Sequence, residues 1–180
     1  MTAFPDDSIA LESDRLRLQP LRPGDEARLR AVFEAARDYF AAIGAGAPTP
    51  EDAAVRELAG CADTAGRAVA VLSLLETGED AGAIGWWSGS PEPGVALLGM
   101  LMVAPAQRGR GLAREALDTL EVWLAGTGVR ALRTAFPYRR QELHPLARAL
   151  GFREMSIAEH AQLGLAGVGT SLWEKPIGGG

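Results

Sequence analysis

The sequence predicts a single α/β domain with six to seven strands and about four helices. Segments with the apolar pattern of strands alternate along the chain with segments whose apolar residues recur at helical spacing. The 180 residues, 47% of them hydrophobic, suffice for one core, and no polar linker long enough to separate two domains interrupts them. We assign residues 11–177 to this domain and expect residues 1–10 and 178–180 to be flexible ends.

The first half of the chain predicts a strand, two helices and two further strands. Residues 15–19 alternate between polar and apolar, which is typical of a strand with one buried face. Apolar residues then recur at helical spacing over residues 26–40. A second helix is expected to begin after Thr49, because this cap residue is followed by a proline and two acidic residues. Strands follow at 67–75 and 83–87, separated by a turn-rich stretch.

The second half of the chain predicts four strands and two helices. The strands are expected at 97–103, 129–136, 152–157 and 170–175. The helices are expected at 112–125 and 142–150, and a glycine follows each of them. Strands and helices therefore alternate up to the C-terminal strand pair.

The most informative segment joins the apolar strand at 97–103 to the helix that begins near Leu112. Its small residues are Gly109, Gly111 and Ala113, and its charged residues are Arg108, Arg110 and Arg114. The first N–H groups of a helix and the positive end of its dipole attract an anion, and small residues let the backbone approach that anion closely. The segment therefore predicts an anion-binding turn.

Two other phosphate-binding patterns do not fit this turn. A nucleotide P-loop requires G-x-x-x-x-G-K-[ST], whereas the one lysine of the chain is Lys175. The dinucleotide-binding pattern G-x-G-x-x-G fails at its third glycine, where the chain has Arg114, and it belongs to the first strand of a βαβ unit rather than to a late one.

The segment from Val103 to Ala113 resembles the acyl-CoA signature of the GNAT superfamily of N-acetyltransferases, R/Q-x-x-G-x-G/A after a hydrophobic strand. Residues 11–25 further resemble the subgroup that includes ribosomal-protein N-terminal acetyltransferases. The resemblance spans residues 11–177 and implies a GNAT-like fold with a central mixed, mostly antiparallel sheet. It also implies an enzyme that uses acetyl-CoA and no metal to acetylate a primary amine of a small molecule or peptide.

The same resemblance implies which residues bind acetyl-CoA. The pyrophosphate is expected at the turn, and the pantetheine arm along the strand, where main-chain groups of Leu101 and Val103 hold it. A main-chain N–H near Val103 is expected to stabilise negative charge on the thioester oxygen. The implied cofactor-binding residues are Leu101, Met102, Val103, Arg108, Gly109, Arg110, Gly111, Leu112, Ala113 and Arg114.

The chain departs from the family pattern at both usual catalytic positions. The signature strand carries no acid to accept the amine proton, and Ala147 stands where many relatives have a tyrosine that protonates the leaving thiolate. His144, one turn earlier on the same helix, and Tyr138 in the preceding loop are the candidate catalytic residues. A capping role for His144 and an ordinary loop position for Tyr138 are the structural alternatives. A catalytically silent acyl-CoA-binding or regulatory module is therefore the alternative function, and a binder of small phosphate ligands is a third.

Two aromatic pairs fall where relatives build the acceptor pocket. One is Tyr39–Phe40 near the end of the first helix, and the other is Trp86–Trp87 on a strand. We assign Tyr39 and Trp86 as substrate-binding candidates, with core packing as the alternative for both. By strand alternation, one tryptophan of the pair faces each side of the sheet.

Charge and composition argue against several other classes. A net charge of −5 without a basic face argues against nucleic-acid binding. The single cysteine, Cys61, excludes an internal disulfide or C-x-x-C site, and His144 and His160 lack the spacing of metal ligands. No signal pattern or membrane-length apolar run occurs, so we expect a cytoplasmic protein without a membrane partner. The resemblance leaves room for a homodimer.

Overall fold

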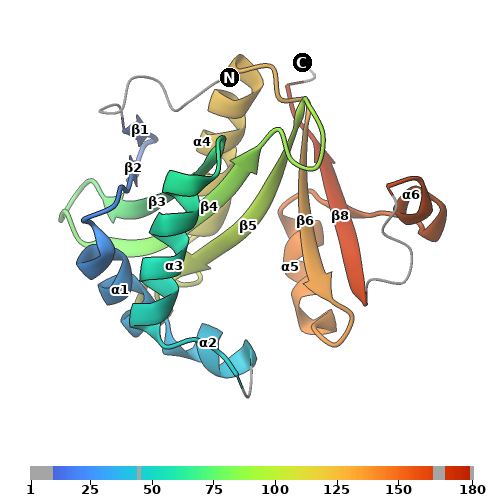
Figure 1. Cartoon of the computed structure of the whole chain (residues 1–180). Helices are drawn as coiled ribbons and strands as arrows, with labels where there is room; N and C mark the ends of the chain where they lie inside the picture. The colour runs from blue at the N-terminus through green and yellow to red at the C-terminus, as the bar shows by residue number, and fades with distance from the viewer. Residues whose placement is uncertain (1–9, 44–45, 164–168, 179–180) are drawn as a thin grey trace.

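The computed structural model describes residues 10–43, 46–163 and 169–178. Its strands form one sheet in the order β1-β2-β3-β4-β5-β6-β8-β7 (Figure 1). The strands are β1 Leu11–Glu12, β2 Leu16–Pro20, β3 Arg67–Leu74, β4 Asp80–Ser88, β5 Val95–Val103, β6 Ala131–Pro137, β7 Arg153–Glu154 and β8 Thr170–Pro176. The α-helices are α1 Glu26–Ala35, α2 Arg37–Ile43, α3 Pro50–Asp63, α4 Leu112–Gly126, α5 His144–Ala149 and α6 Ile157–Gln162. The flexible ends expected at 1–10 and 178–180 lie outside the described residues, apart from Ala10 and Gly178.

The mixed, mostly antiparallel sheet of the predicted α/β fold is confirmed. Every neighbouring pair of strands is antiparallel except β5 and β6, which are parallel. The described residues contain eight strands and six α-helices, more than the six to seven and four expected. The two shortest strands, β1 and β7, have two residues each, too few to show an alternating pattern.

Two predicted elements differ from the observed ones. The helix expected over 26–40 breaks at Ala36, and α2 follows it as a separate helix. The strand expected over 152–157 is reduced to β7, because Ser156 begins α6 with a capping box. In this box the Ser156 side chain accepts from the Glu159 amide, and the Glu159 carboxylate accepts from the Ser156 amide.

Helices cover both faces of the sheet and divide the core into two layers (Figure 1). One face packs against α1 and α3, and the other against α4 and α5. Because side chains alternate along β4, Ala83 lies in the layer that packs against α1 and α3, and Ile84 lies in the layer that packs against α4 and α5. The predicted apolar stripe of α4 is confirmed, and its buried members are Leu112, Ala116, Leu117, Leu120 and Leu124. No helix of the described residues is long and apolar enough to cross a membrane.

Strands β5 and β6 pair only at their first residues, and this divergence positions the candidate site. The parallel pairing runs from Val95 opposite Ala131 to Leu97 opposite Arg133 and then ends. On the other side, β5 stays paired with β4, but the register shifts so that Gly99 has no partner there. Such a bulge bends a strand and increases its twist. The remainder of β5 therefore runs away from β6 (Figure 1).

An ion pair anchors α1 to β4 on the first face. Nε and Nη2 of Arg28 donate to the two carboxylate oxygens of Asp80 at 2.8 and 2.7 Å, and Ser73 donates to the same carboxylate at 2.8 Å. The pKa of Asp80 is lowered, mainly by its hydrogen bonds from Arg28, although partial burial acts to raise it. The carboxylate therefore stabilises the fold in its ionised form.

We expect Asp80→Asn to lower the free energy of unfolding by about 1–2 kcal/mol at pH 7, because it removes the charge from a bidentate pair. A carboxyl pKa that is lower in the folded than in the unfolded chain stabilises the fold at pH values above the unfolded value of about 3.9. The difference between wild type and variant should therefore persist from pH 7 to about pH 5 and shrink as the pH falls below about 4. Urea unfolding across this range measures it. Glu12→Gln, which removes the exposed partner of Arg17, is the control and should change stability by less than about 0.5 kcal/mol.

Candidate functional site

The free edge of β5 forms the first part of the candidate site. The Ala104 amide donates to the Ala81 carbonyl of the adjoining chain at 2.8 Å. By antiparallel alternation, the main-chain groups of Met102 face β4, whereas those of Leu101 and Val103 face the side from which β6 diverges. The two residues predicted to hold a pantetheine arm therefore present their backbone to this edge. Met102, which was also predicted to bind the cofactor, pairs with Ala83 of β4 and is 5% exposed, so its backbone does not face this edge.

The turn after β5 contains two glycines with a left-handed backbone conformation. Gly109 and Gly111 have φ values of +74° and +79°, a region that other residues enter only with strain. Gly111 is the N-cap of α4 and has no side chain to bond the first amides of the helix. The helical hydrogen bonds begin with the Glu115 amide, which donates to the Gly111 carbonyl at 3.1 Å. The amides of Leu112, Ala113 and Arg114 therefore have no acceptor within the helix and are placed to bind an anion.

A network of hydrogen bonds fixes the N-terminus of α4 to the start of the sheet. Glu115 accepts from the Ser13 hydroxyl at 2.7 Å, from the Arg15 amide at 2.9 Å and from Nε of Arg15 at 2.7 Å. Arg15 also donates to the Arg110 carbonyl at 3.0 Å. Leu112, at 2% exposed, buries the first turn in the core. The turn is therefore held in place before any ligand binds.

Arg108 connects this turn to two other parts of the molecule. Its Nε donates to the Val103 carbonyl at 2.8 Å, and its two terminal nitrogens donate to the Asp38 carboxylate of α2 at 2.5 and 3.0 Å. The Arg108 hydrogen bonds are the main cause that lowers the pKa of Asp38. Arg108 thus positions the end of β5 and the start of α2 relative to the turn. Arg110 donates to Gln107 and is exposed, as is Arg114.

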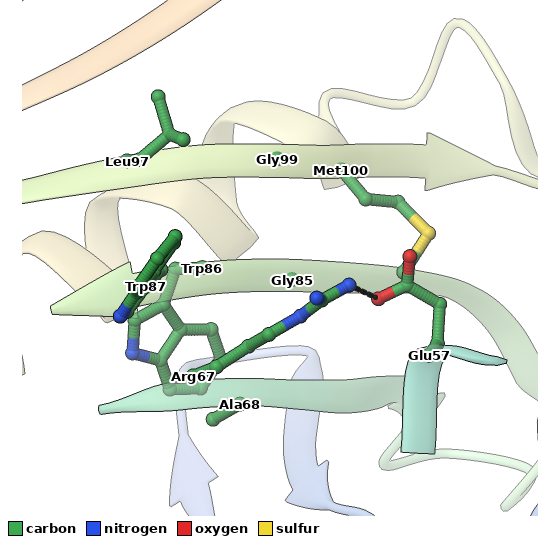
Figure 2. Close-up of a pocket in the computed structure, with 9 residues that line it drawn as sticks. All are labelled: Glu57, Arg67, Ala68, Gly85, Trp86, Trp87, Leu97, Gly99 and Met100. Carbon is green, nitrogen blue, oxygen red and sulfur yellow. Dashed lines mark hydrogen bonds and ion pairs between the residues drawn. The ribbon is translucent and has the colours of Figure 1, made fainter. Parts of the chain in front are cut away.

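A cavity of ≈ 260 Å³ lies beside β5 on the face that α3 covers (Figure 2). Strands β3, β4 and β5 supply most of its walls, and Glu57 reaches it from α3. Glu57 accepts a hydrogen bond from Nη2 of Arg67 at 2.8 Å. The lining residues are Glu57, Arg67, Ala68, Gly85, Trp86, Trp87, Leu97, Gly99 and Met100.

The predicted acceptor residues take different positions around this cavity. Trp86 is 3% exposed and packs edge to face on Trp123 of α4, with ring centroids 5.9 Å apart. Trp87, 38% exposed, is the tryptophan with free surface, and its Nε1 donates to the Ala65 carbonyl at 3.1 Å. Tyr39 does not line the cavity. It packs edge to face on Phe40 at 5.6 Å, and burial raises the pKa of its hydroxyl.

The two candidate catalytic residues lie away from the cavity. His144 begins α5 on the opposite face of the sheet, with its ring 4.9 Å from that of Trp173 and its Nε2 3.4 Å from the Ser171 hydroxyl. Tyr138 is 50% exposed in the loop after β6, and its amide donates to the Gly169 carbonyl. Neither residue lines the cavity. His144 contacts Trp173 on the same face as α4, whose N-terminus follows the turn predicted to bind an anion.

Glu57 and Arg67 were not predicted from the sequence. A carboxylate and a guanidinium ten residues apart, one on a helix and one on the next strand, leave no local pattern. Trp87 was not among the predicted contacts either, because alternation alone does not tell which tryptophan faces the core. The part of the chain that the structure describes holds no group of three His, Cys, Asp or Glu side chains placed to bind a metal ion. The expectation that no metal takes part stays a prediction.

The chain matches the family model for the Acetyltransferase (GNAT) family over residues 29–152. It is similar to an acetyltransferase from Thermus thermophilus, at 29% identity and a TM-score of 0.73, over 94% of this chain and 100% of that one. It also has the fold of an acetyltransferase from Agrobacterium tumefaciens, at 20% identity and a TM-score of 0.66, over 97% and 98% of the two chains. The ribosomal-protein-S5-alanine acetyltransferase from Vibrio fischeri shares the fold at 16% identity and a TM-score of 0.66, over 94% and 97%. No curated protein matches the chain significantly.

The matched range includes β5, the turn at Arg108–Ala113 and all of α4. The family that this segment predicted is therefore confirmed, and its acyl-CoA-binding residues stay predictions. The chain belongs to the GNAT family of acetyltransferases.

Proposed function

We propose that the protein is an acetyl-CoA-dependent N-acetyltransferase that acts on the primary amine of a small molecule or peptide. One observation carries the proposal: the free backbone edge of β5 leads directly into the uncapped N-terminus of α4. The edge offers main-chain hydrogen bonds to an amide-containing arm, and the turn offers amides and arginines to a pyrophosphate. The β5 edge thus complements the pantetheine arm, and the turn that follows it complements the pyrophosphate, in the order in which these two parts are joined in acetyl-CoA.

In this proposal, acetyl-CoA supplies the activated acyl group, and the protein supplies position and charge. Leu101 and Val103 hold the pantetheine arm, and the amides of Gly109 to Arg114 hold the pyrophosphate. A main-chain N–H of the β5 edge stabilises the charge that develops on the thioester oxygen. The cavity beside Gly99 and Met100 places an amine next to the same edge. Holding the amine and the thioester in attack geometry accounts for much of the rate.

The second candidate function is an acyl-CoA-binding module without catalysis. Two observations favour it: β5 carries no acid, and Ala147, where many relatives have tyrosine, is 2% exposed and presents no proton donor. Release of free thiol from acetyl-CoA, measured across a panel of amines, separates the two functions. An enzyme releases thiol in proportion to the acetylated amine. A module binds acetyl-CoA in calorimetry and releases none with any amine. Absence of binding would contradict both.

We expect His144→Gln to lower kcat by about tenfold and to leave acetyl-CoA affinity unchanged. General acids contribute about 10²–10⁴-fold in many enzymes, but a thiolate with a pKa near 8.5 leaves readily without a full proton transfer. Glutamine keeps a hydrogen-bonding group near Ser171. Steady-state kinetics measures the effect, with Tyr138→Phe as the comparison. An unchanged kcat in His144→Gln together with a reduced kcat in Tyr138→Phe would reassign the acid to Tyr138.

The other predictions from the sequence concern the subgroup, assembly, partners and location of the protein and the residues that contact the acceptor. The following stay predictions from the sequence: membership of the subgroup of ribosomal-protein acetyltransferases, a homodimer, the absence of nucleic-acid and membrane partners, and a cytoplasmic location. Trp86 stays a candidate contact of the acceptor in the cavity, and Tyr39 stays a candidate although it does not line the cavity. We add Trp87 because more of its surface is free.

A further inference from the structure

An ion pair lies in the cavity beside β5, between walls that are otherwise apolar. Glu57 and Arg67 are the charged members of the lining, and their side chains are 33% and 35% exposed (Figure 2). A pair at this depth loses part of its hydration, so it contributes little to stability by itself. One carboxylate and one guanidinium give the cavity no net charge but two separate charged positions. A ligand that carries one charge of each sign complements them.

Glycines leave room for the guanidinium of Arg67. A Cβ at Gly60 of α3 would lie 2.6 Å from Nη1 of Arg67, so a side chain there would displace the guanidinium from its present position. Glycine inside a helix lowers helix stability by about 1 kcal/mol relative to alanine. In α3 this glycine lies where the guanidinium of Arg67 packs. Across β4, the missing side chain of Gly85 leaves the space over which Arg67 extends (Figure 2).

Both charged groups keep hydrogen-bonding capacity for a ligand. Among the described residues, Arg67 donates one side-chain hydrogen bond, from Nη2 to one carboxylate oxygen of Glu57. A guanidinium has five N–H donors in a planar fork that suits a carboxylate. The carboxylate of Glu57 has a second oxygen that can accept from an ammonium group.

The rest of the lining suits a compact apolar group. Trp87 is 38% exposed, and Leu97 and Met100 extend the apolar surface along β5. Gly99 leaves the β5 end of the cavity without a side chain. A volume of ≈ 260 Å³ lies just below the range of drug-sized ligand pockets, about 300–1,000 Å³, and suits a small ligand.

We propose that the acceptor is a free apolar α-amino acid. Arg67 binds its carboxylate, Glu57 receives its ammonium group, and its side chain packs on Trp87. The inference rests on the proposed function, since the β5 edge places the acyl donor beside the amine. Glu57 takes one proton from the ammonium group, and the neutral nitrogen then forms the C–N bond with the acetyl carbon. The C–S bond breaks, the thiolate leaves with the electron pair, and it takes the second proton of the nitrogen, so that the products are the amide and the free thiol. Glu57 thus serves as the base that β5 does not carry.

Binding to the CoA-saturated protein tests the selection without requiring turnover. L-leucine and L-phenylalanine are titrated calorimetrically and compared with isopentylamine and phenethylamine, which lack the carboxylate, and with the two amino-acid amides, in which it is neutral. We expect the amino acids to bind at least about tenfold more tightly than either comparison, the effect of one charge-assisted carboxylate contact. Equal or weaker binding of the amino acids would overturn the inference and leave the proposed function intact. Failure of CoA itself to bind would instead contradict the proposed function.

Variants of the pair then assign the roles. Arg67→Met should lower the affinity for the amino acids by about 10–30-fold and so remove the preference for them. The affinities for CoA and for the simple amines should stay unchanged. Arg67→Lys keeps the charge but not the fork and should lose about 3–10-fold, which protects the test if the methionine variant does not fold. Arg17→Met, which breaks the exposed pair with Glu12, is the matched control and should change nothing. An equal loss for all amines in Arg67→Met would show a merely structural pair and overturn the inference.

Glu57→Gln separates the base from a simple binding group. It should lower kcat for L-leucine more than it raises KM, and turnover should recover at high pH, where the free amine is already neutral. A change confined to KM, with an unaltered pH profile, would overturn the assignment of Glu57 as the proton acceptor.

Discussion

Gly111→Asp is expected to weaken acetyl-CoA binding by about 100-fold or more while the fold stays intact. The substitution puts a carboxylate at the N-cap of α4, where we place the pyrophosphate, so it competes for the same amides and repels the ligand. A Cβ at this position would meet no atom closer than Nη2 of Arg15 at 3.7 Å, so the added side chain has room. Calorimetric titration with acetyl-CoA measures the loss, and circular dichroism checks the fold.

Gly111→Asn is the matched control for this variant. Asparagine has nearly the same shape and tolerates a positive φ about as well as aspartate, but it carries no charge. It should weaken binding by no more than about tenfold, so the difference between the two variants isolates the charge. If Asp and Asn weaken binding equally, shape rather than charge governs the turn. If neither does, the turn does not hold the pyrophosphate.

Gly82→Ala is expected to destabilise the protein by about 3 kcal/mol, the largest effect on folding that we predict. A Cβ on Gly82 would lie 2.2 Å from the Met102 carbonyl oxygen and 3.2 Å from a methyl group of Leu72. The backbone atom cannot move away without loosening the pairing of β4 with β5. For a chain of this size the loss corresponds to a fall of about 6–12 °C in Tm, which thermal unfolding measures.

Gly85→Ala, three residues along the same strand, is the control. Its added methyl group would meet the side chain of Met100 at 3.4 and 3.5 Å and the Ala68 carbonyl oxygen at 3.7 Å, which are close to ordinary contact distances. We expect a change of less than about 1 kcal/mol. Equal effects of the two substitutions would mean that the loss comes from chain flexibility rather than from the collision with β5.

The elements that form the proposed cofactor half of the site were predictable because their signals are local. The apolar strand, the small residues of the turn and the stripe of α4 all act through neighbours in sequence, and the strand and the stripe were found where expected. The break at Ala36 had no such signal. The apolar spacing continues through it, because Phe33 and Phe40 pack on each other across the break, with ring centroids 5.2 Å apart.

The acceptor half was not predictable because tertiary contacts create it. Glu57 and Arg67 meet only after α3 folds back onto β3, and Gly60 gains its role only once a guanidinium packs on it. Alternation placed the two tryptophans on opposite faces correctly, but which one faced α4 depended on Trp123. The tether between Arg108 and Asp38 likewise joins residues 70 positions apart.

The most direct test of the acyl-CoA site is a titration of the isotope-labelled protein with CoA, followed through its backbone amide resonances. The account predicts that the largest changes fall on the amides of Leu101 and Val103 and on those of Gly109 to Arg114. Amides of α6, which lies beyond the β8–β7 edge of the sheet, should stay unchanged and serve as an internal control. If CoA saturates the protein while the amides of the turn do not move, the assignment of this turn as the acyl-CoA site is wrong.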